Sequence, residues 1–208
     1  MSIFDLVLIV SFLVVVSGLL GLLIALLTRR WLRVRRIIWG LVIYVSVYVL
    51  TLLSVSLFSP QRVLAMHEIR CFDDWCIAVE QVDQRAAVGE VKPQGSFYLV
   101  TVQVSSQAKR ISQRETDVGI YLLDSQGRRY NPDPLAQQAL EVAGQAGEPL
   151  NTLMAPGDSF THTAVFDLPE GISELGLAIS HGAFPGLIII ANDQSLLHKP
   201  TIVRLAAQ

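Results

Sequence analysis

Charged residues are scarce in this sequence, and they are nearly absent from two long segments near its N-terminus. Asp, Glu, Lys and Arg make up 16% of the 208 residues, against about 25% in typical soluble domains. One charge, Asp5, falls within residues 3–27, and none falls within residues 37–58. These segments exclude an ordinary soluble fold for the N-terminal part of the chain, because a soluble helix of this length carries a polar face.

Motifs of catalysis and of metal binding are also lacking. The sequence contains no Gly-rich phosphate loop, no nucleophile elbow and no H-E-x-x-H motif. No pair among its four histidines has the spacing of metal ligands. We therefore expect a protein that is not an enzyme, with no catalytic residues, no cofactor and no bound metal.

Cysteine is rare, with only Cys71 and Cys76 in the stretch CFDDWC. The C-x-x-C spacing of redox motifs is absent, and the spacing present is a poor match to zinc sites. A metal site that recruits His67, Asp73 and Asp74 is therefore the weaker alternative. On the oxidising side of a membrane the pair predicts a disulfide, whose short loop would contribute about 2 kcal/mol.

The two uncharged segments have the length of membrane spans. A helix of about 20 apolar residues crosses the hydrocarbon core of a bilayer, and residues 3–27 and 37–58 both satisfy this requirement. The alternatives are a buried core helix and a cleaved signal peptide, but the first segment lacks the basic start and short apolar core of a signal peptide. Residues 1–59 are therefore predicted to form a transmembrane helical hairpin with a turn at 28–36.

Five arginines occupy this turn, in the stretch RRWLRVRR, and they predict its side of the membrane. They are Arg29, Arg30, Arg33, Arg35 and Arg36. Lys and Arg next to membrane spans stay in the cytoplasm, and anionic lipid headgroups are their natural contact there. We therefore expect the N-terminus and everything after Phe58 to lie on the opposite, extracytoplasmic side.

Two tyrosines in the second segment raise the question of a neighbour within the membrane. Tyr44 and Tyr48 are four residues apart, so they share one face of a helix. Hydroxyls at membrane depth suggest contact with a partner protein or a pigment. The alternative is that both rings simply face lipid.

Beyond residue 60 the pattern changes to the alternation of β-strands. After a linker at 60–66, residues 67–208 form the expected domain, which is acidic, with 11 Lys and Arg against 17 Asp and Glu from residue 60 onward. Nucleic acid is therefore not expected as a partner. The predicted strands, separated by Gly, Pro, Asn and Asp turns, are 77–82, 97–106, 118–124, 128–130, 159–168, 173–180, 186–190 and 201–206. Residues 134–144 are helical in composition and are expected to bridge two strands across one end of an antiparallel β-sandwich.

Four stretches resemble a widespread bacterial Ig-like domain of unknown function, found in secreted antigens and surface lipoproteins. They are GSFYLVTVQVSS, LLDSQGRRY, APGDSFTHTAVFDLPEG and LGLAIS, and the resemblance covers roughly residues 66–206. It implies an Ig-like antiparallel sandwich, and it carries over no catalytic residue because the shared motifs close turns. A two-helix anchor departs from the secreted and lipid-anchored forms.

One apolar loop is a candidate contact surface. Phe184 and Pro185 stand between glycines in HGAFPGLIII, and an exposed apolar tip suggests a partner or a membrane. The alternative is that Phe184 folds back into the core.

Together these features predict a non-catalytic subunit in a bacterial inner membrane. Its Ig-like domain would brace or help to assemble a larger membrane complex, for example a respiratory or photosynthetic one. Membrane lipids and that complex are the expected partners. The alternative is a free-standing envelope module that binds a ligand or senses stress.

Overall fold

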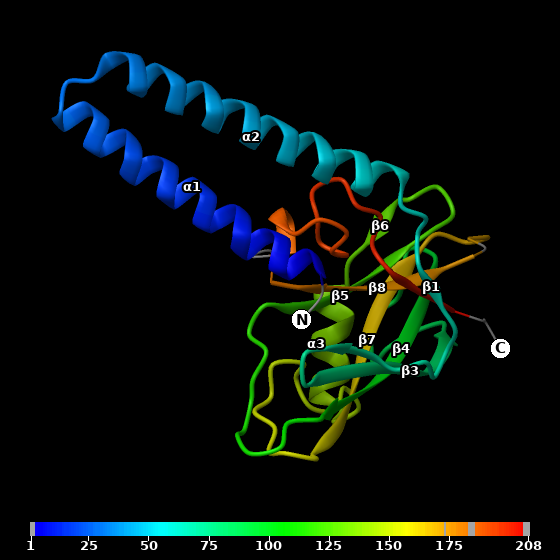
Figure 1. The fold of residues 1–208 in the computed structure, drawn as a ribbon. Coiled ribbons are helices and arrows are strands. Elements are labelled where there is room, and N and C mark those ends of the chain that lie inside the picture. Colours follow the sequence, from blue (N-terminus) through cyan, green and yellow to red (C-terminus); the bar gives the residue numbers. More distant parts are fainter. Residues whose placement is uncertain (1–2, 173, 183–185, 206–208) are drawn as a thin grey trace. The chain divides into compact units, whose positions relative to one another are not determined.

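The computed structural model describes residues 3–172, 174–182 and 186–205 (Figure 1). The chain divides into two units. One contains residues 1–60 together with 183–199, and the other contains residues 61–182 together with 200–208. Residues 183–199 were expected within the β domain, so the division corrects the single boundary drawn from the sequence.

The helical unit is built on the hairpin α1 (Ile3–Leu27) and α2 (Trp31–Phe58). Both helices are long enough and apolar enough to cross a membrane. Only 6% and 11% of their most apolar windows are buried, which is unlike the core helix of a soluble protein. Where they meet, Gly18 lies against Leu41, and a Cβ on Gly18 would lie 2.6 Å from the Leu41 Cδ2 atom.

The second helix starts earlier than the sequence predicted. It begins at Trp31 rather than at residue 37, so Arg33, Arg35 and Arg36 belong to the helix and not to the turn. The physical reason is that arginine is a good helix former. The helix therefore extends beyond the N-terminal end of the apolar segment.

The other unit is a β-sandwich of two sheets. One sheet contains β2 (Arg70–Phe72), β3 (Trp75–Arg85), β4 (Ser96–Ser106) and β7 (Ser159–Leu168), in that order. The other has the order β1-β9-β8-β5-β6, with β1 (Val63–Leu64), β9 (Ile202–Arg204), β8 (Gly176–His181), β5 (Val118–Leu123) and β6 (Arg129–Tyr130). Neighbouring strands are antiparallel except β1 and β9, which pair in parallel. The linker expected at 60–66 therefore contains an edge strand.

A single core joins the two sheets. Val100, Val102 and Phe166 from one sheet and Leu122 and Leu177 from the other are fully buried in one cluster. The inward valines alternate along β4, as the period of two in the sequence indicated. This packing establishes the sandwich predicted from the sequence.

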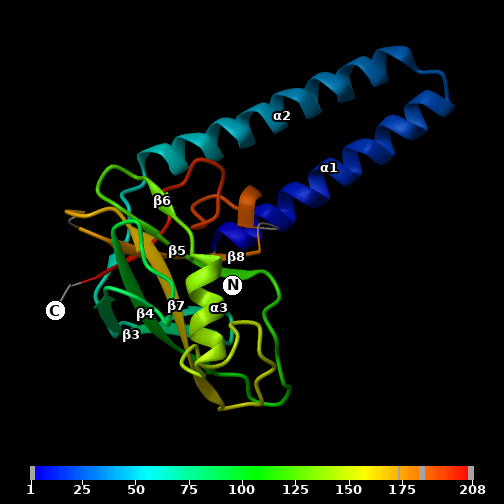
Figure 2. The same cartoon turned by 180° about the vertical axis from the view of Figure 1, so that it is seen from behind.

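Helix α3 (Pro134–Val142) covers an outer face of the sandwich and does not bridge strands across one end (Figure 2). Its Ala136 and Leu140 are buried with Phe97, Leu99 and Val165, which point out of the sheet of β4 and β7. These three side chains need a cover because they are apolar. Asp133 caps the helix by accepting a hydrogen bond from the Ala136 amide at 2.8 Å.

The run GLIII is not a strand, contrary to the sequence prediction. Residues Gly186–Ile188 form the 3-10 helix η1, and the Ile189 amide donates to the Gly186 carbonyl at 3.1 Å. A short apolar run without alternation does not distinguish a strand from a buried turn. Here the hydrogen bonds are local, so no neighbouring strand is required.

Candidate functional site

The basic end of the hairpin is a tight turn closed by backbone hydrogen bonds. The Arg30 amide donates to the Ala25 carbonyl at 2.9 Å, and the Arg29 amide donates to the Leu26 carbonyl at 3.0 Å. Arg29 has a φ of 52°, the left-handed conformation that ends many helices. The turn therefore needs only a few residues, and it brings all five arginines to one end of the hairpin.

No carboxylate neutralises this cluster. All five arginines are exposed, and among the described residues none of them forms an ion pair. Arg35 and Arg36 also line a groove of about 460 Å³, together with Trp39 and Gly40. Nothing lies within 4 Å of a Cβ placed on Gly40, so the groove is open. Its lining combines guanidinium groups with apolar side chains, which correspond to the two chemical parts of an anionic lipid.

Tyr44 and Tyr48 have hydrogen-bond partners within this chain. The Tyr44 hydroxyl donates to Ser11 Oγ on α1 at 2.9 Å. The Tyr48 hydroxyl donates to the Ile188 carbonyl at 2.7 Å. Neither hydroxyl therefore requires an acceptor from another protein or a pigment, which was the reason for proposing them as partner contacts. The other two candidate partner contacts, Phe184 and Pro185, lie outside the described residues.

The two cysteines are joined in a disulfide across the β2–β3 hairpin. Cys71 and Cys76 are register partners, and their Cα atoms lie 3.9 Å apart. The turn between them includes Asp73 with a φ of 53°. The bond therefore closes the hairpin, and Trp75, which is fully buried next to it, packs the hairpin on the core.

An aromatic and ionic cluster lies beside this hairpin. The Phe72 ring stacks on the His181 imidazole with 4.8 Å between ring centroids. The Arg70 guanidinium lies 4.4 Å from the centroid of the Phe72 ring. The His181 Nε2 atom lies 2.9 Å from Glu115 Oε2. These contacts connect β2, β8 and the segment before β5, which is a structural role.

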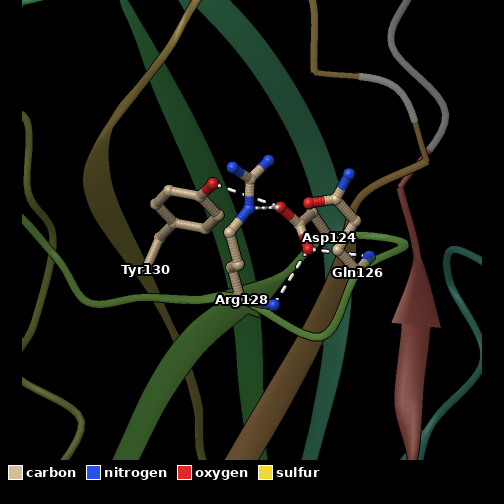
Figure 3. Close-up of polar contacts among 4 residues, drawn as sticks. All are labelled: Asp124, Gln126, Arg128 and Tyr130. Atoms are coloured by element: carbon tan, nitrogen blue, oxygen red, sulfur yellow. Dashed lines mark hydrogen bonds and ion pairs between the residues drawn. The ribbon is translucent and has the colours of Figure 1, made fainter.

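The carboxylate of Asp124 binds several groups of the turn between β5 and β6 (Figure 3). It accepts from the amides of Gln126 and Arg128, each at 2.9 Å, from Arg128 Nε at 2.6 Å, and from the Tyr130 hydroxyl at 3.2 Å. Burial raises the pKa of Asp124, but the hydrogen bonds from Arg128, Gln126 and Tyr130 outweigh it, and the pKa lies below its usual value. Every polar contact of this cluster serves the turn.

A cavity of about 250 Å³ opens on the sandwich next to α3. Its polar lining includes Thr116, Glu141, Asn151 and His162. The Nδ1 atom of His162 lies 2.9 Å from the Glu148 carbonyl, which can only accept, so Nε2 remains as an acceptor. Burial lowers the pKa of His162 despite the opposing effect of this hydrogen bond, which favours a neutral ring. The cavity therefore offers acceptors to a small donor-bearing molecule.

Comparisons with known proteins give distant likenesses only. No family model and no curated protein matches the chain. Among solved structures, the secreted protein MPT63 from Mycobacterium tuberculosis is 12% identical, with a TM-score of 0.42 over 60% of this chain and 92% of its own. A conserved hypothetical protein from Bacillus anthracis is 15% identical, with a TM-score of 0.44 over 56% and 89%. An uncharacterized β-sandwich protein from Clostridium difficile is 8% identical, with a TM-score of 0.41 over 71% and 96%. These likenesses carry no conclusion about function.

The sequence identified the basic turn, the disulfide and the turn in LLDSQGRRY that begins at Asp124, but it gave no indication of the cavity. The lining of the cavity comes from three separated stretches around residues 116–118, 141–151 and 162. No spacing rule connects such positions. Likewise, nothing near Tyr48 in sequence points to Ile188 as the acceptor of its hydroxyl.

Proposed function

We propose that this protein is a non-catalytic subunit anchored in a bacterial inner membrane by two helices. Its Ig-like domain lies outside the cytoplasm and braces or helps to assemble a larger membrane protein complex. An energy-converting complex, respiratory or photosynthetic, is the class of partner we favour. Membrane lipids complete its surroundings.

The observation that carries this proposal is the exposed apolar surface of the hairpin. Phe12 on α1 and Leu50 on α2 are 66% and 64% exposed, and neither helix has a continuous polar stripe that would face water. Such a surface requires lipid or protein around it. Because the residues that meet between the helices include the small Gly18 and Ser11, most of the large side chains remain available to neighbours.

Orientation follows from the charge at the turn. Five exposed arginines without carboxylate partners favour the cytoplasmic side, where positive loops are retained. The disulfide between Cys71 and Cys76 fits the oxidising compartment on the other side. The groove beside Arg35 and Arg36 would then hold an anionic phospholipid of the cytoplasmic leaflet.

Purification of the tagged chain in a mild detergent, followed by mass spectrometry, tests the proposed role. We expect a membrane protein complex to accompany the chain in stoichiometric amounts. The variant with Phe12→Ala and Leu50→Ala should recover less of that partner, whereas Val142→Ala, which changes an exposed residue of α3, should recover as much as the wild type. Recovery of the chain alone from native membranes would overturn the bracing role.

The cavity at His162 supports a second candidate, an envelope module that binds a small ligand. Its neutral imidazole and the Glu141 carboxylate favour a molecule with hydrogen-bond donors, such as a small amine or amide. Thermal unfolding of the full chain with a panel of such compounds tests this candidate. A compound that stabilises the wild type but not His162→Phe would favour it, and a panel without effect would exclude these ligand classes.

A further inference from the structure

The connection between β8 and β9 leaves the sandwich and joins the helical unit. Residues 183–199 cluster with the hairpin, although they stand between two neighbouring strands of one sheet. Its first part is uncharged from Gly182 to Asn192, and its charged residues, Asp193 and Lys199, come later. Because this apolar part is attached to two apolar helices, we ask whether water or lipid surrounds it.

The Tyr48 hydroxyl indicates the depth of this segment along α2. Tyr48 lies twelve residues after Arg36 and ten residues before Phe58, which corresponds to about 18 Å and about 15 Å along a helix. In a bilayer with a core of about 30 Å, Tyr48 would stand near the middle. Its hydroxyl donates to the Ile188 carbonyl at 2.7 Å, so η1 (Gly186–Ile188) is held at that depth.

Several backbone amides of the segment have acceptors within it, which bears on a requirement of the membrane interior. Irregular backbone is tolerated there only where its polar groups are satisfied by the protein. The amides of Ile189, Asn192, Ser195, Leu196 and His198 all donate to carbonyls within the segment, at 2.9–3.3 Å. The Ser195 hydroxyl donates to the Ile189 carbonyl, and the Asn192 side chain accepts from the Gln194 amide at 2.9 Å.

The surface that the segment leaves exposed is apolar. Leu187 and Ile188 in η1 are 41% and 39% exposed, and Leu196 and Leu197 are 46% and 61% exposed. The polar Ser195, by contrast, is buried. Asn192, Asp193, Gln194 and His198 are half-buried. The most exposed side chains are thus apolar, whereas an ordinary surface loop presents mainly polar side chains to water.

We infer that residues 186–198 form a re-entrant loop whose η1 turn enters the bilayer from the side at which α2 ends. The occupant of its exposed surface is the acyl chains of lipid. The Tyr48 hydroxyl holds the loop against α2. This inference rests on the proposed insertion of the hairpin, and it adds a third element of the chain to the membrane.

Spin labels on the full chain in phosphatidylcholine and phosphatidylglycerol vesicles test the loop. Because the described chain contains no free cysteine, a label on Leu187→Cys reports that site alone. Leu50→Cys on α2 serves as the lipid reference, and Val142→Cys on α3, where the native residue is 85% exposed, serves as the water reference. We expect the label at 187 to be accessible to oxygen and protected from a nickel chelate, as at 50 and unlike at 142.

The three labels separate failure of the loop from failure of the anchor. A label at 187 that is open to the nickel chelate while the label at 50 is protected would overturn the re-entrant loop and leave the anchor intact. Exposure of both labels to the chelate would overturn the anchor, and the loop with it. Protection of the label at 187 from both reagents would place it against protein and would overturn the contact with lipid.

Tyr48→Phe tests the link to α2, with Tyr44→Phe as its matched control. Both changes remove one hydroxyl from the same helix face, but the Tyr44 hydroxyl bonds to Ser11 and not to the loop. We expect Tyr48→Phe to raise the mobility of the label at 187, or its exposure to the chelate, at least twofold, and Tyr44→Phe to leave both unchanged. Equal effects of the two variants, or no effect of Tyr48→Phe, would overturn the anchoring role of Tyr48.

Discussion

Asp124 illustrates how one buried carboxylate can determine a turn. Its side chain binds two amides, a guanidinium and a phenol of the same hairpin, and Gly127 supplies the positive φ of 76° that the turn requires. Side-chain acceptors of this kind replace backbone partners that a tight turn cannot supply. The D-x-x-G-R-x-Y pattern is therefore readable as a turn from sequence, whereas the burial of its charge is visible only in the fold.

Replacing Asp124 with Asn should lower the thermal unfolding midpoint at pH 7, because a charged acceptor of several hydrogen bonds is lost. The pKa of Asp124 is lowered in the folded state from its ordinary value of 3.8, because its hydrogen bonds to Arg128, Gln126 and Tyr130 outweigh the effect of burial. Its contribution is therefore complete above that value and is lost as the pH falls through the folded pKa. The difference in unfolding midpoint between wild type and variant, measured from pH 7 to pH 2, should thus begin to shrink below about pH 4.

The control for this prediction is Asp74→Asn, which changes an exposed aspartate in the β2–β3 turn. It should leave the midpoint close to that of the wild type at every pH. A difference between wild type and Asp124→Asn that stays constant down to pH 2 would contradict the role assigned to the ionised carboxylate.

At the scale of the elements, two of the three glycines of the hairpin, Gly18 and Gly40, allow a matched test of helix packing. A Cβ on Gly18 would lie 2.6 Å from Leu41 Cδ2 and 3.1 Å from Leu41 Cγ, whereas a Cβ on Gly40 would meet nothing within 4 Å. Gly18→Leu should therefore destabilise the hairpin by about 1–3 kcal/mol through overpacking. Gly40→Leu should have little effect.

An unfolding titration with SDS in mixed micelles, followed by tryptophan fluorescence, measures this difference. Trp31 and Trp39 both lie on α2 and report on the basic end of the hairpin. Equal destabilisation by the two glycine variants would show that the helices do not meet at Gly18.

The disulfide belongs to the β2–β3 hairpin, and its effect can be isolated. The double variant Cys71→Ser and Cys76→Ser should lose about 2 kcal/mol of unfolding free energy, because the loop that the bond closes is short. Urea unfolding in micelles with and without dithiothreitol measures this loss. Reductant should bring the wild type to the stability of the double variant and should leave the double variant unchanged; a wild type insensitive to reductant would contradict the prediction.

How much of each element the sequence predicts depends on whether its signal is local. The alternation of Val100, Val102 and Val104 predicts β4, and the turn residues around Ser159–Leu168 predict β7 with its observed bounds. The parallel pairing of β1 with β9 joins residues far apart in sequence, which no local pattern encodes. The position of α3 could have been predicted. Phe97 and Leu99 are apolar and lie on the face of β4 opposite to the inward valines, which indicates that another element covers that face.

At the scale of the whole molecule, the orientation of the hairpin in the membrane determines which compartment contains the β domain. The five arginines at one end of the hairpin predict that this end is cytoplasmic. Thr28→Cys should therefore react with a membrane-impermeant maleimide only after the cells are permeabilised to the cytoplasm. Val142→Cys on α3 should react once the outer barrier alone is opened.

A charge-neutral version of the turn tests the cause of this orientation. Replacing all five arginines with Gln should produce a mixed population in which both sites become partly reactive under each condition. The reverse labelling pattern in the wild type would place the β domain in the cytoplasm and would contradict the proposed function.

The chain passes between its two units three times, near residues 60, 182 and 199. A protease that cuts only after Pro60 would therefore not free the β domain from the hairpin, since residues 183–199 still belong with the helices. Shedding of the domain would require at least two further cuts. For the same reason, a truncated protein that starts at residue 61 would still contain part of the apolar helical unit. We expect it to aggregate and to be poorly soluble unless residues 183–199 are replaced by a short hydrophilic linker.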